Sequence, residues 1–182
     1  MFIGLPLVRV EIPDASLTIV GANPCKVVRE LGKKTGVRVL GFVESMSDAL
    51  NGAQVAVAPM QSGSGMQFKV LEAMACGIPV VASSLGLGDI KALPGLEVQI
   101  GDTAEAFASH VIRLLRDPEL ARNIGQRGRD FVLRNHNWSV AASHIDSMYQ
   151  QLRGRLSVSL REQALQPDVY SGGPKVSPVL KY

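Results

Sequence analysis

Cysteine and histidine are scarce in this sequence of 182 residues, and their positions exclude two classes of site. Cys25 and Cys76 lie far apart, form no Cys-x-x-Cys pair and have no histidine nearby in sequence. Neither a disulfide framework nor a zinc site is therefore expected. The 3 histidines fall in predicted helices without a paired acid or nucleophile, so we interpret them as packing or surface residues.

Long apolar runs are also missing from the sequence. No run approaches the roughly 18 apolar residues that a membrane-spanning helix needs. The first residues, Met1-Phe-Ile-Gly-Leu-Pro6, lack the basic start and apolar core of a secretory signal. We therefore expect a cytoplasmic protein.

No charge of one sign dominates the chain. The formal net charge is +3 and the isoelectric point is near 9.0, with lysine and arginine spread among acidic residues. This distribution argues against nucleic acid as a partner. The small basic excess suits a phosphate-bearing ligand or the anionic inner surface of a membrane. An Asp-x-Asp pair that could hold a divalent ion against phosphates is absent, so we expect no metal and no cofactor.

The residues that are abundant predict an α/β protein. Hydrophobic residues make up 46% of the chain, which suffices for the core of one ordinary domain. Short apolar runs alternate with helical patterns, and the predicted strands are Leu17–Val20, Val37–Leu40, Val55–Ala58 and Val80–Ala82. This alternation forms parallel β-α-β units that bind ligands beyond the carboxyl ends of their strands. We predict a Rossmann-like parallel sheet flanked by helices.

One stretch joins a small polar loop, a helix and a buried strand. The loop is Ser62–Gly65, the helical pattern covers Met66–Cys76, and Gly77 ends it before the strand Val80–Ala82. Because a helix N-terminus presents unpaired N–H groups, this loop is a candidate phosphate site. The glycine-bearing segment Ser83–Asp89 is expected to be a flexible loop at the same edge of the sheet.

Two charged residues lie on this otherwise apolar helix. Lys69 and Glu72 are three positions apart, so a solvated ion pair between them is one interpretation. However, the helix dipole disfavours a cation in the first turns, and an anion bound at the loop explains Lys69 better. Glu72 is then placed to accept hydrogen bonds from a ribose diol.

The run Gly65-Met-Gln-Phe-Lys-Val-Leu-Glu-Ala-Met-Ala-Cys-Gly-Ile-Pro-Val-Val-Ala-Ser83 resembles the donor-site signature of family 4-type glycosyltransferases of the GT-B fold. It is most similar to bacterial exopolysaccharide-system sugar transferases, in which a basic residue occupies the position of Lys69. Further segments agree in the family's order across roughly residues 5–152, namely Ile12–Gly21, Val37–Val43, Val55–Pro59 and Asn137–Ser139.

The resemblance implies roles for particular residues but identifies no catalytic one. The implied contacts to the donor diphosphate are Ser64, Gly65, Met66 and Lys69. Glu72 would bind the ribose, while Phe42 and Val43 would lie against the base. A glutamate that commonly contacts the donor sugar in this family is replaced here by Ser64, so no carboxylate contact to the sugar is expected at that position.

The resemblance also implies how the chain is divided. GT-B enzymes enclose their cleft between two Rossmann-like domains, and this chain corresponds to the C-terminal, donor-binding one. We expect an N-terminally truncated nucleotide-sugar-binding domain over residues 1–153 and a disordered tail over residues 154–182. The first strand of the domain has no counterpart here. In the usual doubly wound order it would lie between the strands at Leu17–Val20 and Val55–Ala58.

The leading hypothesis is the donor-binding half of a hexosyltransferase acting in polysaccharide or glycolipid synthesis. Its donor would be a UDP-, GDP- or ADP-linked sugar, and its missing N-terminal acceptor domain or a partner chain would supply the acceptor site, so the chain is expected to be inactive alone. Two alternatives remain open. One is a non-catalytic nucleotide-binding remnant or interaction module, in which Lys69 and Glu72 form a structural pair. The other is half of a sugar-nucleotide epimerase.

Overall fold

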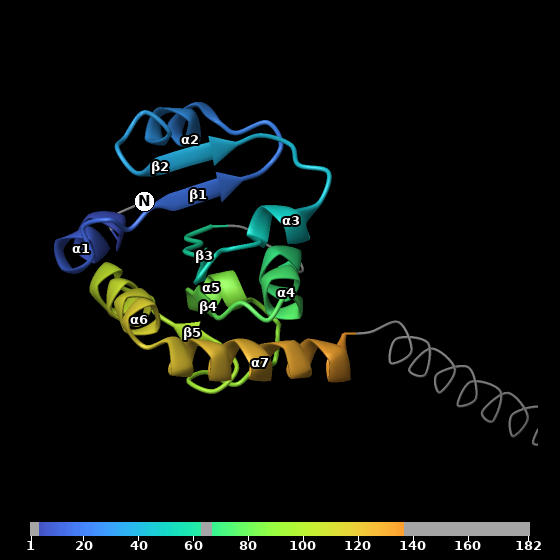
Figure 1. Cartoon of the computed structure of the whole chain (residues 1–182). Helices are drawn as coiled ribbons and strands as arrows, with labels where there is room; N and C mark the ends of the chain where they lie inside the picture. Colours follow the sequence, from blue (N-terminus) through green and yellow to red (C-terminus); the bar gives the residue numbers. More distant parts are fainter. Residues whose placement is uncertain (1–3, 63–66, 137–182) are drawn as a thin grey trace, which may run out of the picture. The chain divides into compact units, whose positions relative to one another are not determined.

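Helices and strands alternate along the chain in the computed structural model, which describes residues 4–62 and 67–136 (Figure 1). These residues belong to one compact unit that ends at Asn137. The strands are β1 (Leu17–Val20), β2 (Val37–Leu40), β3 (Ala56–Ala58), β4 (Val80–Ala82) and β5 (Gln99–Ile100). The helices are α1 (Gly4–Glu11), α2 (Lys26–Leu31), α3 (Met46–Leu50), α4 (Phe68–Ala75), α5 (Ser84–Leu87), α6 (Ala104–Arg116) and α7 (Pro118–Asn135).

Every strand ladder in the described residues is parallel. β1 pairs with β2, with Leu17 opposite Val37, and their arrows point the same way in Figure 1. A second sheet has the order β3-β4-β5, with Val81 of β4 opposite Val57 on one side and Gln99 on the other. The predicted α/β fold of parallel strands flanked by helices is confirmed.

Strands β1 and β3 belong to separate sheets, and each keeps one edge without a ladder within the described ranges. In β1, the N–H of Leu17 donates to the carbonyl of Gly36, on the side of β2. Alternate residues of a strand direct their backbone N–H and C=O groups to opposite edges, so those of Thr18 and Val20 point away from β2. In β3, Ala56 donates toward β4, and Val57 faces away.

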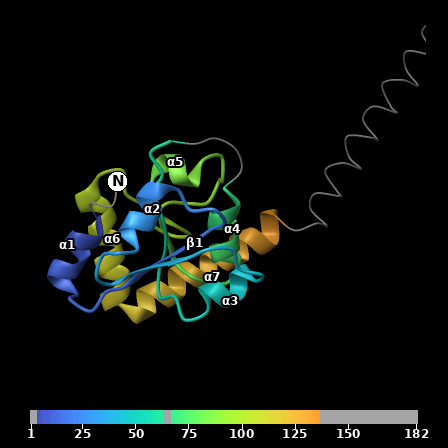
Figure 2. The same cartoon turned by 90° about the horizontal axis from the view of Figure 1, so that it is seen from above.

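Strand β4 separates two apolar clusters because successive side chains of a strand point to opposite faces. Val80 and Ala82 pack into a cluster that also contains residues of α4 and Phe131 of α7. Val81 packs instead with Val8 of α1 and with residues of α6. Figure 2 shows α1 lying beside α6, in agreement with their packing contacts. All three β4 side chains are buried, so β4 is the centre of the core.

Helices α6 and α7 each begin at a side-chain cap. Thr103 caps α6 by accepting a hydrogen bond from the N–H of Ala106, and Asp117 caps α7 by accepting one from Leu120. Pro118 occupies the first turn of α7, where its missing N–H costs nothing. Further along α7, Gly125 lies against the turn after α4, since a Cβ there would stand 2.1 Å from the carbonyl oxygen of Gly77. Only glycine allows this close approach.

The expectation of a flexible loop over Ser83–Asp89 is wrong, because residues Ser84–Leu87 form the short helix α5. The side chain of Ser83 caps this helix by accepting a hydrogen bond from the N–H of Gly86 at 3.0 Å. A Cβ at Gly86 would stand 2.2 Å from the carbonyl oxygen of Ala58, so the glycine allows α5 to pack against the end of β3. A residue that suggests flexibility in sequence here permits a tertiary contact.

Among the helices of the described residues, none is long and apolar enough to cross a membrane. The domain boundary expected at residue 153 and the tail expected over residues 154–182 lie outside the described residues.

Candidate functional site

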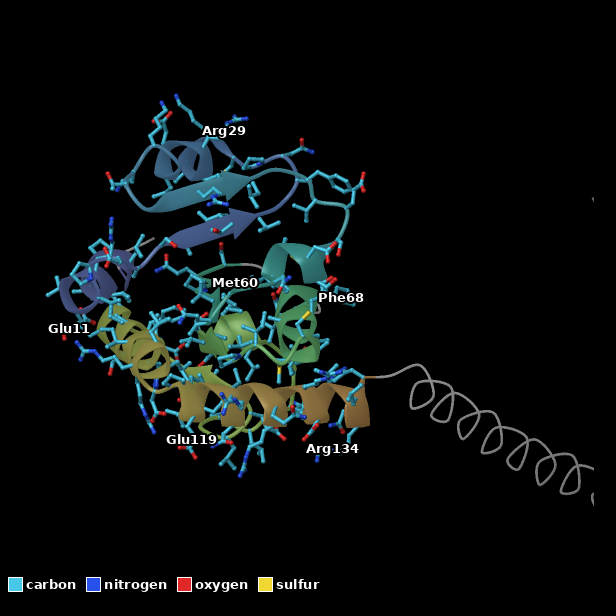
Figure 3. The ribbon with its side chains drawn as sticks, in the orientation of Figure 1. Glu11, Arg29, Met60, Phe68, Glu119 and Arg134 are labelled. Carbon is cyan, nitrogen blue, oxygen red and sulfur yellow. The ribbon has the colours of Figure 1, made fainter. Side chains whose placement is uncertain are left out.

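The carboxyl ends of β3 and β4 are joined by a buried serine. Ser83, the first residue after β4, donates its hydroxyl hydrogen to the carbonyl oxygen of Met60 at 2.7 Å. Its backbone N–H donates to the carbonyl of Ala58 at 3.1 Å. Figure 3 shows Met60 and Phe68, which lie near the two ends of the connection between β3 and α4. The segment that leads into the predicted phosphate loop is therefore fixed to the residue after the neighbouring strand β4.

The end of β5 is tied to the same edge of the sheet through Asp102. Its carboxylate accepts one hydrogen bond from the N–H of Ser84 at 2.7 Å and one from the Ser84 hydroxyl at 2.6 Å. These two bonds, the hydroxyl first, lower the pKa of Asp102 because they favour the ionised carboxylate. Together with Ser83, this pair links the ends of all three strands of the β3-β4-β5 sheet.

Lys69 lies at the start of α4, close to the predicted phosphate loop. Its ammonium donates a hydrogen bond to the side-chain oxygen of Gln67 at 2.8 Å. Gln67 is the N-cap residue of α4 and is only 4% exposed, whereas Lys69 itself is exposed. The positive end of the helix dipole and the lysine cation are thus at the same helix end, an arrangement that favours an anion.

Glu72 lies on α4 one turn after Lys69 and is exposed. Among the ion pairs of residues 4–62 and 67–136, none joins these two side chains. Lys69 turns toward Gln67 at the helix start instead. The interpretation of Lys69 and Glu72 as a structural ion pair is therefore not supported by the geometry.

Phe42 and Val43 follow directly after β2. Phe42 is 79% exposed, and Val43 is partly buried. An aromatic ring left this open to solvent is available for stacking on a flat ligand. Phe68, at the first position of α4, is a second open aromatic ring at 64% exposure, and the resemblance gave it no role.

The structure places the predicted site residues in two groups. Lys69 and Glu72 share α4, whereas Phe42 and Val43 follow the separate β1–β2 sheet. The described link between the groups is α3, which begins just after Val43 and packs against α4. Ser64, Gly65 and Met66, the remaining predicted diphosphate contacts, lie outside the described residues.

Gln67, Ser83, Ser84 and Asp102 hold this edge of the sheet together, and the sequence interpretation gave none of them a role in the site. Part of the signal was local, since two serines directly after a buried strand can cap a following helix. The pairing of Ser84 with Asp102 spans 18 residues and depends on the sheet order, which no local pattern reveals.

Within the described ranges, no group of three or more His, Cys, Asp or Glu residues could hold a metal ion. An open groove between α1 and α6 is lined by Leu7, Ala108, Ile112 and other residues, and none of the predicted site residues contributes to it.

Comparison with known proteins agrees with this arrangement. Residues 4–117 match the family described as group 1 glycosyl transferases. A phosphatidyl-myo-inositol mannosyltransferase of Propionibacterium freudenreichii is 33% identical over 152 residues, which cover 80% of this chain and 37% of that protein. A GDP-mannose-dependent monoacylated alpha-(1-6)-phosphatidylinositol monomannoside mannosyltransferase of Corynebacterium glutamicum is 30% identical over 159 residues, covering 80% of this chain and 42% of that protein.

Among solved structures, the sucrose-phosphate synthase of Thermosynechococcus elongatus is similar with a TM-score of 0.68 and 28% sequence identity. The likeness covers 85% of this chain and 42% of that one. The chain thus spans about two fifths of the length of these relatives. The family match covers more than half of the residues, and the parallel strands and the helix that carries Lys69 follow the predicted order. This chain belongs to the group 1 glycosyltransferases.

Proposed function

We propose that this chain is the donor-binding half of a glycosyltransferase that moves a hexosyl group from a nucleotide-sugar to an acceptor in polysaccharide or glycolipid synthesis. The observation that carries the proposal is the position of the Lys69 ammonium, held at the start of α4 beside the loop that follows β3. Ligands of parallel α/β sheets bind at this edge. Membership of the glycosyltransferase family supports the reaction class.

The proposed chemistry is electrostatic. In sugar transfer the bond between the anomeric carbon and the diphosphate oxygen breaks, and negative charge develops on the departing diphosphate. The oxygen of the acceptor hydroxyl bonds to that carbon, and the hydroxyl proton passes to the diphosphate or to solvent. Lys69 and the N–H groups at the start of α4 would stabilise this charge. We retain Ser64, Gly65 and Met66 as proposed backbone contacts to the same diphosphate.

The nucleoside would be held by the two groups of predicted residues. Glu72, exposed and without an ion-pair partner in the described part of the chain, is proposed to accept hydrogen bonds from the ribose hydroxyls. Phe42 and Val43 are proposed to lie against the base, with the open ring of Phe42 stacking on it. A UDP-, GDP- or ADP-linked sugar satisfies these contacts, and the name of the Corynebacterium relative favours GDP.

The acceptor is proposed to bind outside this chain, on an N-terminal domain or a partner chain, because the chain spans about two fifths of its relatives. We further propose that the donor domain covers residues 1–153 and is followed by a disordered tail over residues 154–182. The names of the phosphatidylinositol mannosyltransferases and the net charge of +3 support a lipid acceptor reached from the cytoplasmic membrane surface.

Titration calorimetry with UDP, GDP, ADP and their hexose conjugates tests donor binding. We expect at least one nucleoside diphosphate to bind, and binding of none would overturn the proposal. Glu72→Ala should weaken that binding about tenfold or more, because a charged hydrogen bond contributes about 1.5–3 kcal/mol. The melting temperature should be unchanged because Glu72 is exposed.

Product analysis separates the alternatives. With the acceptor domain supplied, acceptor-dependent sugar transfer supports the proposal. Nucleotide binding without transfer would indicate a non-catalytic remnant, and interconversion of the sugar-nucleotide without any acceptor would indicate an epimerase.

A further inference from the structure

Gln67 is a polar side chain buried at the point where α4 begins. It is 4% exposed, and burial of an amide is costly unless the amide is hydrogen-bonded. Its side-chain oxygen accepts the hydrogen bond from the Lys69 ammonium at 2.8 Å. A Cβ placed on Gly88 would lie 3.2 Å from Cγ of Gln67, so the backbone after α5 packs closely against the glutamine stem.

Capping of helix α4 does not explain why the polar side chain of Gln67 is buried there. An N-cap side chain ordinarily accepts a hydrogen bond from an N–H in the first helical turn. The Gln67 side chain makes no such bond, and the N–H groups of Val70 and Leu71 donate to its backbone carbonyl instead. Its side-chain oxygen is therefore directed to the lysine.

The bond to Gln67 opposes two effects that would move the Lys69 ammonium away. A lysine side chain loses rotamer entropy when it is fixed, and the positive end of the α4 dipole repels a cation. An amide oxygen holds the ammonium without cancelling its charge. A carboxylate at this position would pair with the lysine and neutralise it before any anion arrived.

We propose that Gln67 is a positioning residue that presents the Lys69 ammonium to the diphosphate of the donor. The proposal rests on the donor-binding function proposed above. Gly88 contributes by leaving the space in which the glutamine stem is packed. The packing of Gly88 against Gln67 joins the start of α4 to the segment after α5. Ser83 and Asp102 hold this same edge of the sheet together, so the position of the Lys69 ammonium depends on that edge.

The first test is a double-mutant cycle on Gln67 and Lys69. The affinities of UDP and GDP, and of uridine and guanosine, are measured by calorimetry for the unaltered chain, Gln67→Ala, Lys69→Ala and the double variant. Gln67→Ala should weaken diphosphate binding roughly five- to tenfold, the range of one hydrogen bond, and leave nucleoside binding unchanged. In the Lys69→Ala background the same substitution should have no further effect, because the two residues act as one unit.

Two further variants separate positioning from folding. Gln67→Glu keeps the size of the side chain, and it should weaken UDP and GDP binding because the new carboxylate neutralises Lys69. Gln126→Ala removes a glutamine that bonds to Asp130 on α7, and it should leave all four affinities unchanged. Circular dichroism melts of each variant report any loss of folding.

The outcomes distinguish the inference from the function on which it rests. Equal losses for diphosphates and nucleosides, or an undiminished loss in the Lys69→Ala background, would show that Gln67 serves only the fold and would overturn the proposal. Failure of the unaltered chain to bind any of UDP, GDP and ADP would instead overturn the donor-binding function, and the role of Gln67 with it.

Discussion

The two sheets differ in how deeply they are buried. In the β3-β4-β5 sheet, β4 is completely enclosed, with helices α4 and α7 on one face and α1 and α6 on the other. In the β1–β2 sheet no residue is fully buried, and the same holds for all of residues 9–57. The free energy of folding therefore comes mainly from the β3-β4-β5 sheet and the helices packed on it, because burial of apolar area is its dominant favourable source.

This contrast divides the proposed donor site as well. Lys69 and Glu72 project from a helix that packs on the enclosed sheet, whereas Phe42 and Val43 follow the exposed one. The diphosphate contacts would thus have a firmly packed support, and the base contacts a weaker one. Local stability varies across a protein in the same way, with the fewest buried contacts at the least stable places.

The largest expected effect comes from removing a core side chain of the enclosed sheet. Met74 of α4 is 0% exposed, so Met74→Ala should lower the free energy of unfolding by about 2–5 kcal/mol, the usual cost of such a cavity. Leu40→Ala in half-buried β2 should cost less than half as much. Urea denaturation of both variants measures the difference, and equal losses would contradict the assignment of stability to one sheet.

A smaller effect, on ligand binding, is expected from removing the Lys69 side chain on α4, the helix that packs on the enclosed sheet. Lys69→Ala should weaken binding of a nucleoside diphosphate by about 1.5–3 kcal/mol and leave that of the nucleoside nearly unchanged, since its proposed partner is phosphate. Lys33→Ala is the matched control, because Lys33 forms an exposed pair with Glu30 at 2.8 Å. Equal losses for both ligands in calorimetry would refute the assignment of Lys69.

Phe42 follows the exposed β1–β2 sheet, and Phe42→Ala should weaken nucleoside and nucleotide binding alike. Stacking of a base on an aromatic ring is worth about 1–3 kcal/mol, and Phe42 contributes little to the core at 79% exposure. Phe68→Ala removes another open aromatic ring and should leave the preference between bases unchanged. A changed melting temperature for Phe42→Ala, with unaltered affinities, would assign the ring to the fold.

The smallest expected effect concerns the pH dependence of stability at Asp102. Because its pKa is lowered in the folded state, its stabilising contribution is present above the unfolded pKa of about 3.9 and is lost as pH falls through the lower, folded value. The stability difference between the unaltered chain and Asp102→Asn should therefore shrink as pH falls from about 5 to about 3. Asp130→Asn is the control, and a difference that stays constant with pH would contradict the role of the Ser84 bonds.

Much of the fold could be predicted from sequence because its signals are local. Short runs rich in apolar residues marked Leu17–Val20, Val37–Leu40 and Val80–Ala82 with the bounds that the structure has. Thr103 and Asp117 are residue types that favour the start of a helix, and their side chains cap α6 and α7. The spacing of apolar residues and the presence of capping residues are properties of neighbouring positions, so they can be recognised in the sequence without knowledge of the tertiary structure.

The parts that sequence could not predict depend on contacts between distant segments. Helix α5 was missed because its glycines suggest a loop, while Gly86 is needed for close contact with Ala58. The Lys69–Glu72 pair was left open because helical spacing permits it, and only the buried Gln67 shows where the lysine turns. The split into two sheets is likewise a property of strand order.

The packing of α1 on α6 has a consequence for the order in which the chain folds. Arg116 at the end of α6 donates to the carboxylate of Glu11 in α1 at 2.7 Å, across a sequence separation of 105 residues. Contacts of such long range form late because closing the intervening loop costs entropy first. During synthesis from the N-terminus, no α6 side chain can cover Val8 until the residues of α6, Ala104–Arg116, are being made. The earliest described helix therefore completes its side of the core only after nearly all of the described residues exist.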